Sequence, residues 1–184
     1  LFINSSGQLL APYRALSDDE VFAYFTVNDY EITLDLNAND DPTAVLNTDG
    51  VQLTDNKVYI TFGTKKIYNS MDTSSRVTVA PKATRTGYDF IGWATSADAT
   101  ALSECAINAS GQLINNSTFS EADTLYAVWR IGTFVITTDL TDAKIIDFSM
   151  TGDATEQETE NTYRVNFGTE VRIAFNNMPG YSFT

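Results

Sequence analysis

The residues best suited to chemistry form an oxygen-rich run that follows an apolar stretch. Asp35, Asn37, Asn39 and Asp41 place side-chain oxygens at alternate positions, as the start of a calcium loop does. The run lacks the glycine at the sixth position and the glutamate at the twelfth that complete such a loop. A turn in which Asp or Asn side chains accept backbone N–H groups explains the same residues. We therefore expect no metal site, and these four residues are the candidate ligands if there is one.

Cys105 is the second residue with reactive chemistry, and it is the only cysteine. One cysteine excludes an internal disulfide. Its equivalent in the internal repeat described below is Leu1, so we expect an apolar packing position and an inert thiol.

The chain has no histidine, which removes Ser–His and Cys–His nucleophiles and the commonest acid–base group near neutral pH. We predict no catalytic residue, no cofactor and no enzyme activity; a carboxylate pair in a deep cleft would reverse this.

Four aromatic residues, Tyr88, Trp93, Tyr126 and Trp129, are candidates for a sugar-binding platform. Trp and Tyr also bury large areas and anchor small sheets. Their positions within apolar stretches favour packing over ligand binding. An exposed coplanar pair would favour carbohydrate binding instead.

These residues need a scaffold of strands. Residues 30–36 alternate so that Tyr30, Ile32, Leu34 and Leu36 share one face, the pattern of a half-buried strand. Further strands are expected at 58–62, 76–80, 90–93 and 125–129. Helix signals are limited to single turns at 17–20 and 120–123 and a short helix within 95–105. The predicted fold class is mainly β, α+β at most.

The composition of the chain restricts the classes of partner that it is expected to bind. The net charge of -13 disfavours nucleic acid and anionic membrane surfaces, and no apolar stretch is long enough for a spanning helix. Charged residues make up only 19% of the chain, and small polar residues are plentiful, as in many exported β proteins. The chain begins Leu1-Phe2-Ile3 without methionine, so we expect a piece of a longer extracellular protein.

An internal repeat organises the chain. Residues 3–36 align without a gap to residues 107–140, a constant offset of 104, with twelve identities in 34 positions. The match begins with INSSGQLL against INASGQLI and ends with ITLDL against ITTDL. It resumes at Phe-Gly-Thr (62–64 and 167–169) and at Gly-Tyr (87–88 and 180–181). The counterpart of the calcium-like run keeps Asp139 but adds Lys144.

The repeat predicts three parts: the end of one unit at 1–28, a complete unit at 29–131 and the start of another at 132–184. The alternative is a structural unit that is offset from the sequence repeat. Residues 21–25 would then pair with 30–36, and residues 125–129 with 134–140.

Several motifs occur in order: a strand ending in an Asp/Asn turn, Phe-Gly-Thr, the run Arg85-Thr-Gly-Tyr-Asp-Phe-Ile-Gly-Trp93, and Thr124-Leu-Tyr-Ala-Val-Trp129. This order resembles the Listeria–Bacteroides repeat family, also called the internalin B-repeat or Flg_new family. The resemblance covers residues 30–130, and it marks seven residues as structural: Gly87, Tyr88, Phe90, Trp93, Leu125, Tyr126 and Trp129. It implies tandem small β-grasp-like modules, in which the first and last strands pair. Loops around 40–56 and 95–118 are longer than the family pattern.

The resemblance further implies an adhesin-like stalk or protein-binding region of a secreted or cell-surface bacterial protein, without catalysis. Its partners would be a host or bacterial surface protein or glycan, and neighbouring repeats of the same chain. The alternative function is a carbohydrate-binding accessory region of a secreted enzyme.

Overall fold

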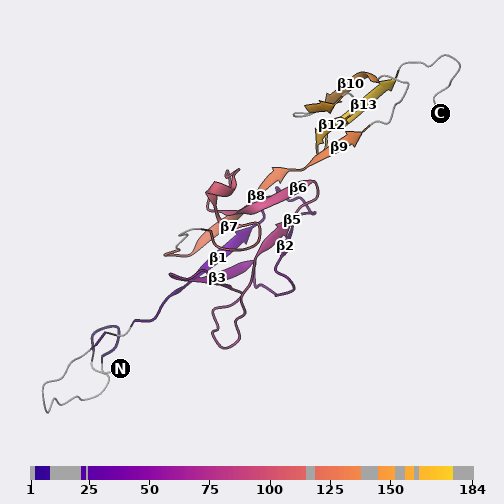
Figure 1. The fold of residues 1–184 in the computed structure, drawn as a ribbon. Helices are drawn as coiled ribbons and strands as arrows, with labels where there is room; N and C mark the ends of the chain where they lie inside the picture. The colour runs from indigo at the N-terminus through magenta and orange to yellow at the C-terminus, as the bar shows by residue number, and fades with distance from the viewer. Residues whose placement is uncertain are drawn as a thin grey trace, which may run out of the picture.

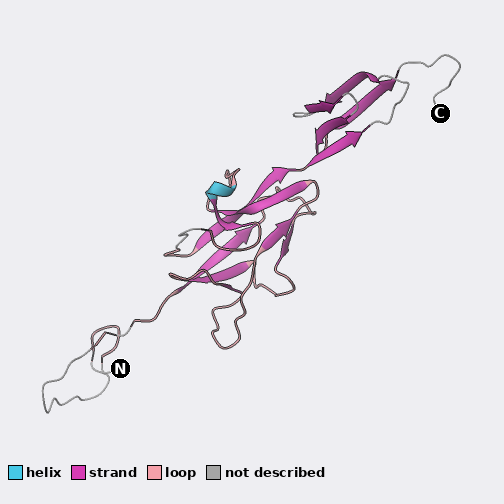
Figure 2. Cartoon of the chain, viewed as in Figure 1, coloured by secondary structure: helices cyan, strands magenta, loops and turns pink. Residues whose placement is uncertain are grey.

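The computed structural model describes residues 3–8, 22–23, 25–114, 119–137, 145–151, 156–159 and 162–175; for 145–151, 156–159 and 172–175 it describes the backbone alone. Strands dominate these residues, with a single short helix (Figure 2). The mainly-β prediction is therefore confirmed. Within this part of the chain no helix is long and apolar enough to cross a membrane.

One six-stranded sheet, the central sheet, lies wholly within residues 29–131, which we call the central module (Figure 1). Its strand order is β4-β3-β1-β8-β6-β7. The strands are β1 (Asp29–Asp35), β3 (Lys57–Thr61), β4 (Ile67–Tyr68), β6 (Tyr88–Ala94), β7 (Cys105–Asn108) and β8 (Asp123–Ile131). The first strand, β1, pairs in parallel with the last, β8, and every other neighbouring pair is antiparallel. The first and last strands of the central sheet, in chain order, are therefore neighbours at its middle.

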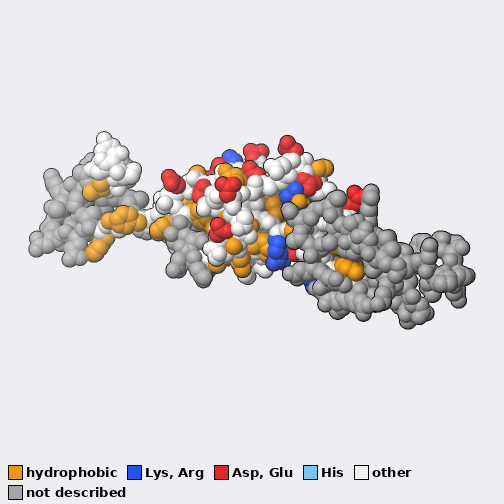
Figure 3. Space-filling model, turned by 90° about the horizontal axis from the view of Figure 1, so that it is seen from above, with side chains coloured by type: hydrophobic (Ala, Val, Ile, Leu, Met, Phe, Trp, Pro, Cys, Tyr) orange, Lys and Arg blue, Asp and Glu red, His pale blue; other side chains and the backbone are white. Residues whose placement is uncertain are grey.

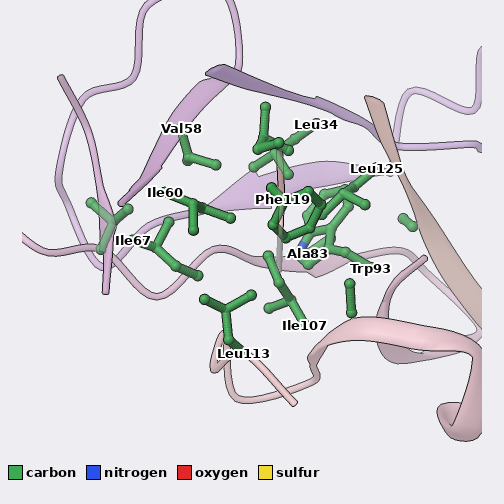
Figure 4. Close-up of a cluster of buried hydrophobic side chains, with 14 residues drawn as sticks. Leu34, Val58, Ile60, Ile67, Ala83, Trp93, Ile107, Leu113, Phe119 and Leu125 are labelled. Atoms are coloured by element: carbon green, nitrogen blue, oxygen red, sulfur yellow. The ribbon is translucent and has the colours of Figure 1, made fainter. Parts of the chain in front are cut away.

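The core forms because the strands alternate as predicted. Ile32 and Leu34 of β1 are buried, as are Leu125 and Ala127 of β8, and they join one hydrophobic cluster with Trp93 (Figure 4). The cluster also includes residues of β3, β4, β5 and β7. A second, smaller cluster contains Val128 of β8 with Ala94, Ala99 and Cys105. Both faces of β8 are thus buried at its middle, where alternation alone would have left one face polar.

Smaller sheets accompany the central one. In the central module β2 (Val45–Asn47) pairs with β5 (Lys82–Thr84), and the 3-10 helix η1 (Leu102–Glu104) precedes β7. After β8, a three-stranded sheet has the order β11-β12-β9, formed by β9 (Thr133–Thr137), β11 (Glu156–Thr159) and β12 (Thr162–Asn166). The strands β10 (Ile145–Thr151) and β13 (Glu170–Phe175) form a separate antiparallel pair.

The strand predicted at 76–80 is wrong. Only Thr78 forms a bridge, to Tyr68. The Asn69 side chain accepts the Val77 N–H at 2.9 Å, so an amide side chain takes the place of a ladder partner. Because β4 ends at Tyr68, no regular ladder extends along this segment.

The helix predictions fare unevenly. The helix expected within 95–105 is the three-residue η1. The turn expected at 120–123 is wrong, because Asp123 already begins β8 and pairs with Ile32 of β1. The turn expected at 17–20 lies outside the described residues.

The offset pairing of strands is also wrong for residues 125–129. These residues belong to β8, which pairs with β1 and β6, whereas β9 pairs with β12. Since β1 has β3 on one side and β8 on the other, it has no free edge for residues 21–25.

Candidate functional site

The oxygen-rich loop after β1 is held by hydrogen bonds within the protein. The Asp35 carboxylate accepts the Asn37 N–H at 2.7 Å, which is the Asx-type turn expected from the sequence. The Asn37 amide donates to the carbonyl oxygens of Ala97 (2.8 Å) and Ala127 (3.3 Å) and so ties the loop to β8. Asn37 and Asn39 both adopt positive φ, which Asn tolerates well.

Asp41, the fourth candidate ligand, is committed to another partner. Its carboxylate accepts the Arg85 Nε–H at 2.8 Å and two bonds from Thr43, from the backbone N–H (2.9 Å) and the hydroxyl (2.8 Å). The Arg85 bond above all, with those from Thr43, lowers the pKa of Asp41 from 3.8 to about 2. Across the described residues, no three His, Cys, Asp or Glu side chains converge as a metal site. Asp41 therefore forms an ion pair with Arg85.

Arg85 links this loop to the Gly87–Tyr88 turn. Its guanidinium carbon lies 4.0 Å from the centroid of the Tyr88 ring, a cation–π arrangement. The Thr86 N–H donates to the Thr43 hydroxyl at 3.1 Å. The loop after β1 thus braces the turn that leads into β6.

The Gly87–Tyr88 turn meets the unit that follows the central module. Gly87 has a φ of +77°, and a Cβ there would lie 2.1 Å from the Phe167 ring. The Tyr88 and Phe167 rings pack edge to face, with centroids 6.2 Å apart. The Gly132 N–H, between β8 and β9, donates to the Gly87 carbonyl at 2.8 Å. We call this contact among Gly87, Tyr88, Gly132 and Phe167 the joint.

Gly132 also fits the joint because it has no side chain. A Cβ at this position would lie 2.9 Å from the Gly87 carbonyl oxygen, which is too close. Its own carbonyl accepts the Phe167 N–H at 2.8 Å. One peptide segment therefore bonds to both the central module and the following unit.

The other structural residues of the sequence prediction lie in or beside the core. Trp93 is fully buried, and its indole N–H donates to the Pro81 carbonyl at 2.9 Å. Trp129 is half-buried and donates to the Leu36 carbonyl at 2.8 Å. Phe90 packs between the two indoles, with centroid distances of 5.3 and 5.5 Å. Leu125 is fully buried and Tyr126 half-buried. Because Trp93 is fully buried, the two tryptophans form no exposed coplanar pair.

Cys105 lies where its repeat partner predicted. Its side chain is buried among Ala94, Ala99 and Val128, and its Sγ is 3.6 Å from the Ala101 carbonyl. Burial raises the pKa of the thiol, and the neighbouring Glu104 carboxylate adds to the effect. A thiol protected in this way is a poor nucleophile.

The sequence analysis did not identify Gly132 and Phe167 of the joint, or Arg85, which links the loop after β1 to the Gly87–Tyr88 turn. Phe167 carried a signal, since it belongs to the repeated Phe-Gly-Thr step. Its contact with Gly87, eighty positions earlier, is not encoded in any local pattern.

No protein family, curated protein or solved structure matches this chain.

Proposed function

We propose that the chain is a non-catalytic structural or interaction region of a secreted or cell-surface protein, built from tandem units of the Listeria–Bacteroides repeat type. The observation that carries the proposal is one strand register that occurs twice. In the central module β1 pairs with β3, and in the following unit β9 pairs with β12.

The two registers agree at all five pairs. Asp29 faces Thr61 and Thr33 faces Lys57 at the two ends of the first ladder; Thr133 faces Asn166 and Thr137 faces Thr162 in the second. The shift is 104 residues on the first strand and 105 on the second, which are the offsets of the sequence alignment. Because a slip of one residue would exchange the two faces of a strand, this agreement supports homologous units.

The ends of the two ladders agree as well. The Phe62 N–H donates to the Asn28 carbonyl at 2.9 Å, and the Phe167 N–H donates to the Gly132 carbonyl at 2.8 Å. Each Phe is followed by a glycine with positive φ, +69° at Gly63 and +81° at Gly168.

A third recurring element lies in the segment that begins the ungapped match. The Asn4 side-chain oxygen accepts the N–H groups of Ser6 and Gln8, and that of Asn108 accepts those of Ser110 and Gln112. Gly7 and Gly111 close these turns with φ values of +76° and +75°. Two nearly identical sequences thus form the same turn, once before the central module and once within it, directly after β7.

A single residue, Gly132, separates β8 from β9, and short connections limit independent motion of neighbouring units. Figure 1 shows β9 leading away from the central sheet in continuation of β8. Such an array suits spacing or display at a surface. The acidic side chains on the face shown in Figure 3 agree with a solvated exterior and disfavour anionic partners.

The carbohydrate-binding alternative depended on exposed aromatic residues. Trp93 is enclosed in the core, and the Trp129 indole N–H is bonded to Leu36. We therefore favour protein partners and neighbouring repeats over a glycan at these tryptophans.

The test is the location of the protein in its own cells. Antibodies to this chain should label intact, unpermeabilised cells or the culture medium, and external protease should remove the signal. A cytosolic protein from the same cells is the control for lysis. Labelling only after permeabilisation would overturn the proposal.

A further inference from the structure

Phe62 presents an aromatic side chain at the surface of the central module, directly after β3, and it is 50% exposed. Its position matches that of Phe167 after β12. Each ring packs against the aromatic residue at the second position of the unit's first strand. The centroid distances are 6.4 Å for Tyr30–Phe62 and 6.2 Å for Phe134–Phe167.

The two phenylalanines differ in the residues that they contact, and both are partly exposed, Phe62 by 50% and Phe167 by 39%. Phe167 lies against Gly87 and Tyr88 of the preceding module. Within the described part of the chain, the ring that meets Phe62 is Tyr30 alone. Asn28, which stands where Gly132 stands in the joint, is also exposed.

We propose that Tyr30, Phe62 and the backbone of Asn28 form the receiving half of a second joint, whose partner is the Gly–Tyr turn of another copy of this unit. The inference rests on the proposed function, since a tandem protein is what places a second copy in line. It is continuous with the joint already described, because the ladder end, the aromatic pair and the Phe N–H bond are the same on both units.

The chemistry of the joint defines the partner. The turn must contain a glycine with positive φ, so that no side chain meets the phenylalanine ring. The glycine carbonyl must accept the N–H of residue 28, as the Gly87 carbonyl accepts that of Gly132. An arginine two residues before the glycine stacks on the tyrosine, as Arg85 does on Tyr88. A copy with Arg-Thr-Gly-Tyr meets all three requirements.

Asn28 makes the second joint slightly looser than the first. A Cβ at Gly132 would approach the Gly87 carbonyl oxygen to 2.9 Å, so the Cβ of Asn28 requires a shift of the docked turn. Replacing Asn28 with Gly should therefore tighten the contact.

The experiment uses the 184-residue chain and a longer chain in which a second copy of residues 29–131 replaces residues 1–27. This places a complete module before Asn28 with the spacing found at Gly132. Amide hydrogen exchange at Asn28 is the readout, and the Gly132 amide is the internal reference. In the longer chain the Asn28 amide should exchange about tenfold more slowly than in the 184-residue chain, because it gains a carbonyl acceptor.

Two variants of the longer chain test the contact from both sides. Phe62→Ala in the original central module, which follows Asn28, should restore fast exchange at Asn28. Gly87→Ala in the added copy should do the same and leaves the receiving module unaltered. Leu102→Ala, at an exposed apolar residue of η1, is the matched control and should leave the Asn28 amide slow. Asn28→Gly should slow exchange at position 28 further.

Fast exchange at Asn28 in a longer chain whose modules melt cooperatively would refute the second joint. Slow exchange that survives both Phe62→Ala and Gly87→Ala would refute it too, since the protection would come from elsewhere. Neither result affects the surface-labelling test, so failure of the joint is distinguishable from failure of the proposed function.

Discussion

Replacing Trp93 with Ala should strongly destabilise the central module. Trp93 is the largest fully buried side chain, and it shares its cluster with Ile107 and Leu125 (Figure 4). Emptying a buried Trp site costs about 3–5 kcal/mol. The Pro81 carbonyl, also buried, would lose its indole donor, which adds about 1–3 kcal/mol. Because domains of this size have unfolding free energies of about 5–15 kcal/mol, the variant should lose a large share of its stability.

Urea unfolding measures the effect, and the chain's two tryptophans make it convenient. Trp129 remains as the fluorescent reporter in every Trp93 variant. Trp93→Phe is the control: it keeps most of the apolar volume and loses the N–H donor, so it should cost less than Trp93→Ala. An unchanged midpoint for Trp93→Ala would refute the packing argument. Equal losses in the two variants would show that the hydrogen bond, not the volume, dominates.

Three further outcomes are expected. Because the pKa of Asp41 is lowered to about 2 in the folded protein, its ionised form stabilises the fold above pH ~4, and this stabilisation is lost as the pH falls towards 2. The difference in urea midpoint between the parent and Asp41→Asn should therefore be constant near neutral pH and shrink between pH ~4 and 2. A difference that stays constant down to pH 2 would contradict this. Thermal melts in millimolar calcium and in chelator should coincide within about a degree, whereas an ion present at 100 times its dissociation constant would add about 2.7 kcal/mol and shift the melt clearly. A thiol reagent should label Cys105 slowly in the native protein and rapidly in denaturant; immediate native labelling would show that the thiol is accessible.

The sequence predicted four of the six strands of the central sheet, including β6 and β8, which contain the predicted residues 90–93 and 125–129. Residues 30–36 and 58–62 appear within a residue or so of their predicted positions as β1 and β3. Alternation identifies such strands because the strand period of two leaves a regular trace when one face is buried. The acidic loop was likewise interpreted correctly as an Asx-type turn, since Asp35 bonds to a backbone N–H only two residues away.

Other features depend on partners that lie far along the chain. The failed strand at 76–80 has a suitable composition, but the Asn69 side chain occupies the position of a ladder partner. Gly87 was predicted to be structural and Tyr88 to pack in the core, and nothing in the sequence indicated that both contact Phe167 of the next unit. Repetition identifies residues that matter in every copy, but it does not separate a contact within a unit from one between units.

Comparison of the two ladders shows how the fold is specified. Of their five paired positions, only Ile32/Ile136 and Thr33/Thr137 are identical between the copies, and none of the partner residues on β3 and β12 is. The register is nevertheless the same. What the copies share is apolar class near the ladder end, at Tyr30/Phe134 and at Ile60/Val165, and the Phe-Gly-Thr step with its positive-φ glycine. Register therefore follows from burial pattern and turn geometry, and the other strand positions are free to vary. The joint makes the opposite demand, because Gly87 and Gly132 are needed for close approach as such. The fold of a unit and its docking to the next are thus set by different residues: position 28, which aligns with Gly132, is Asn, and β1 and β3 keep the register of β9 and β12.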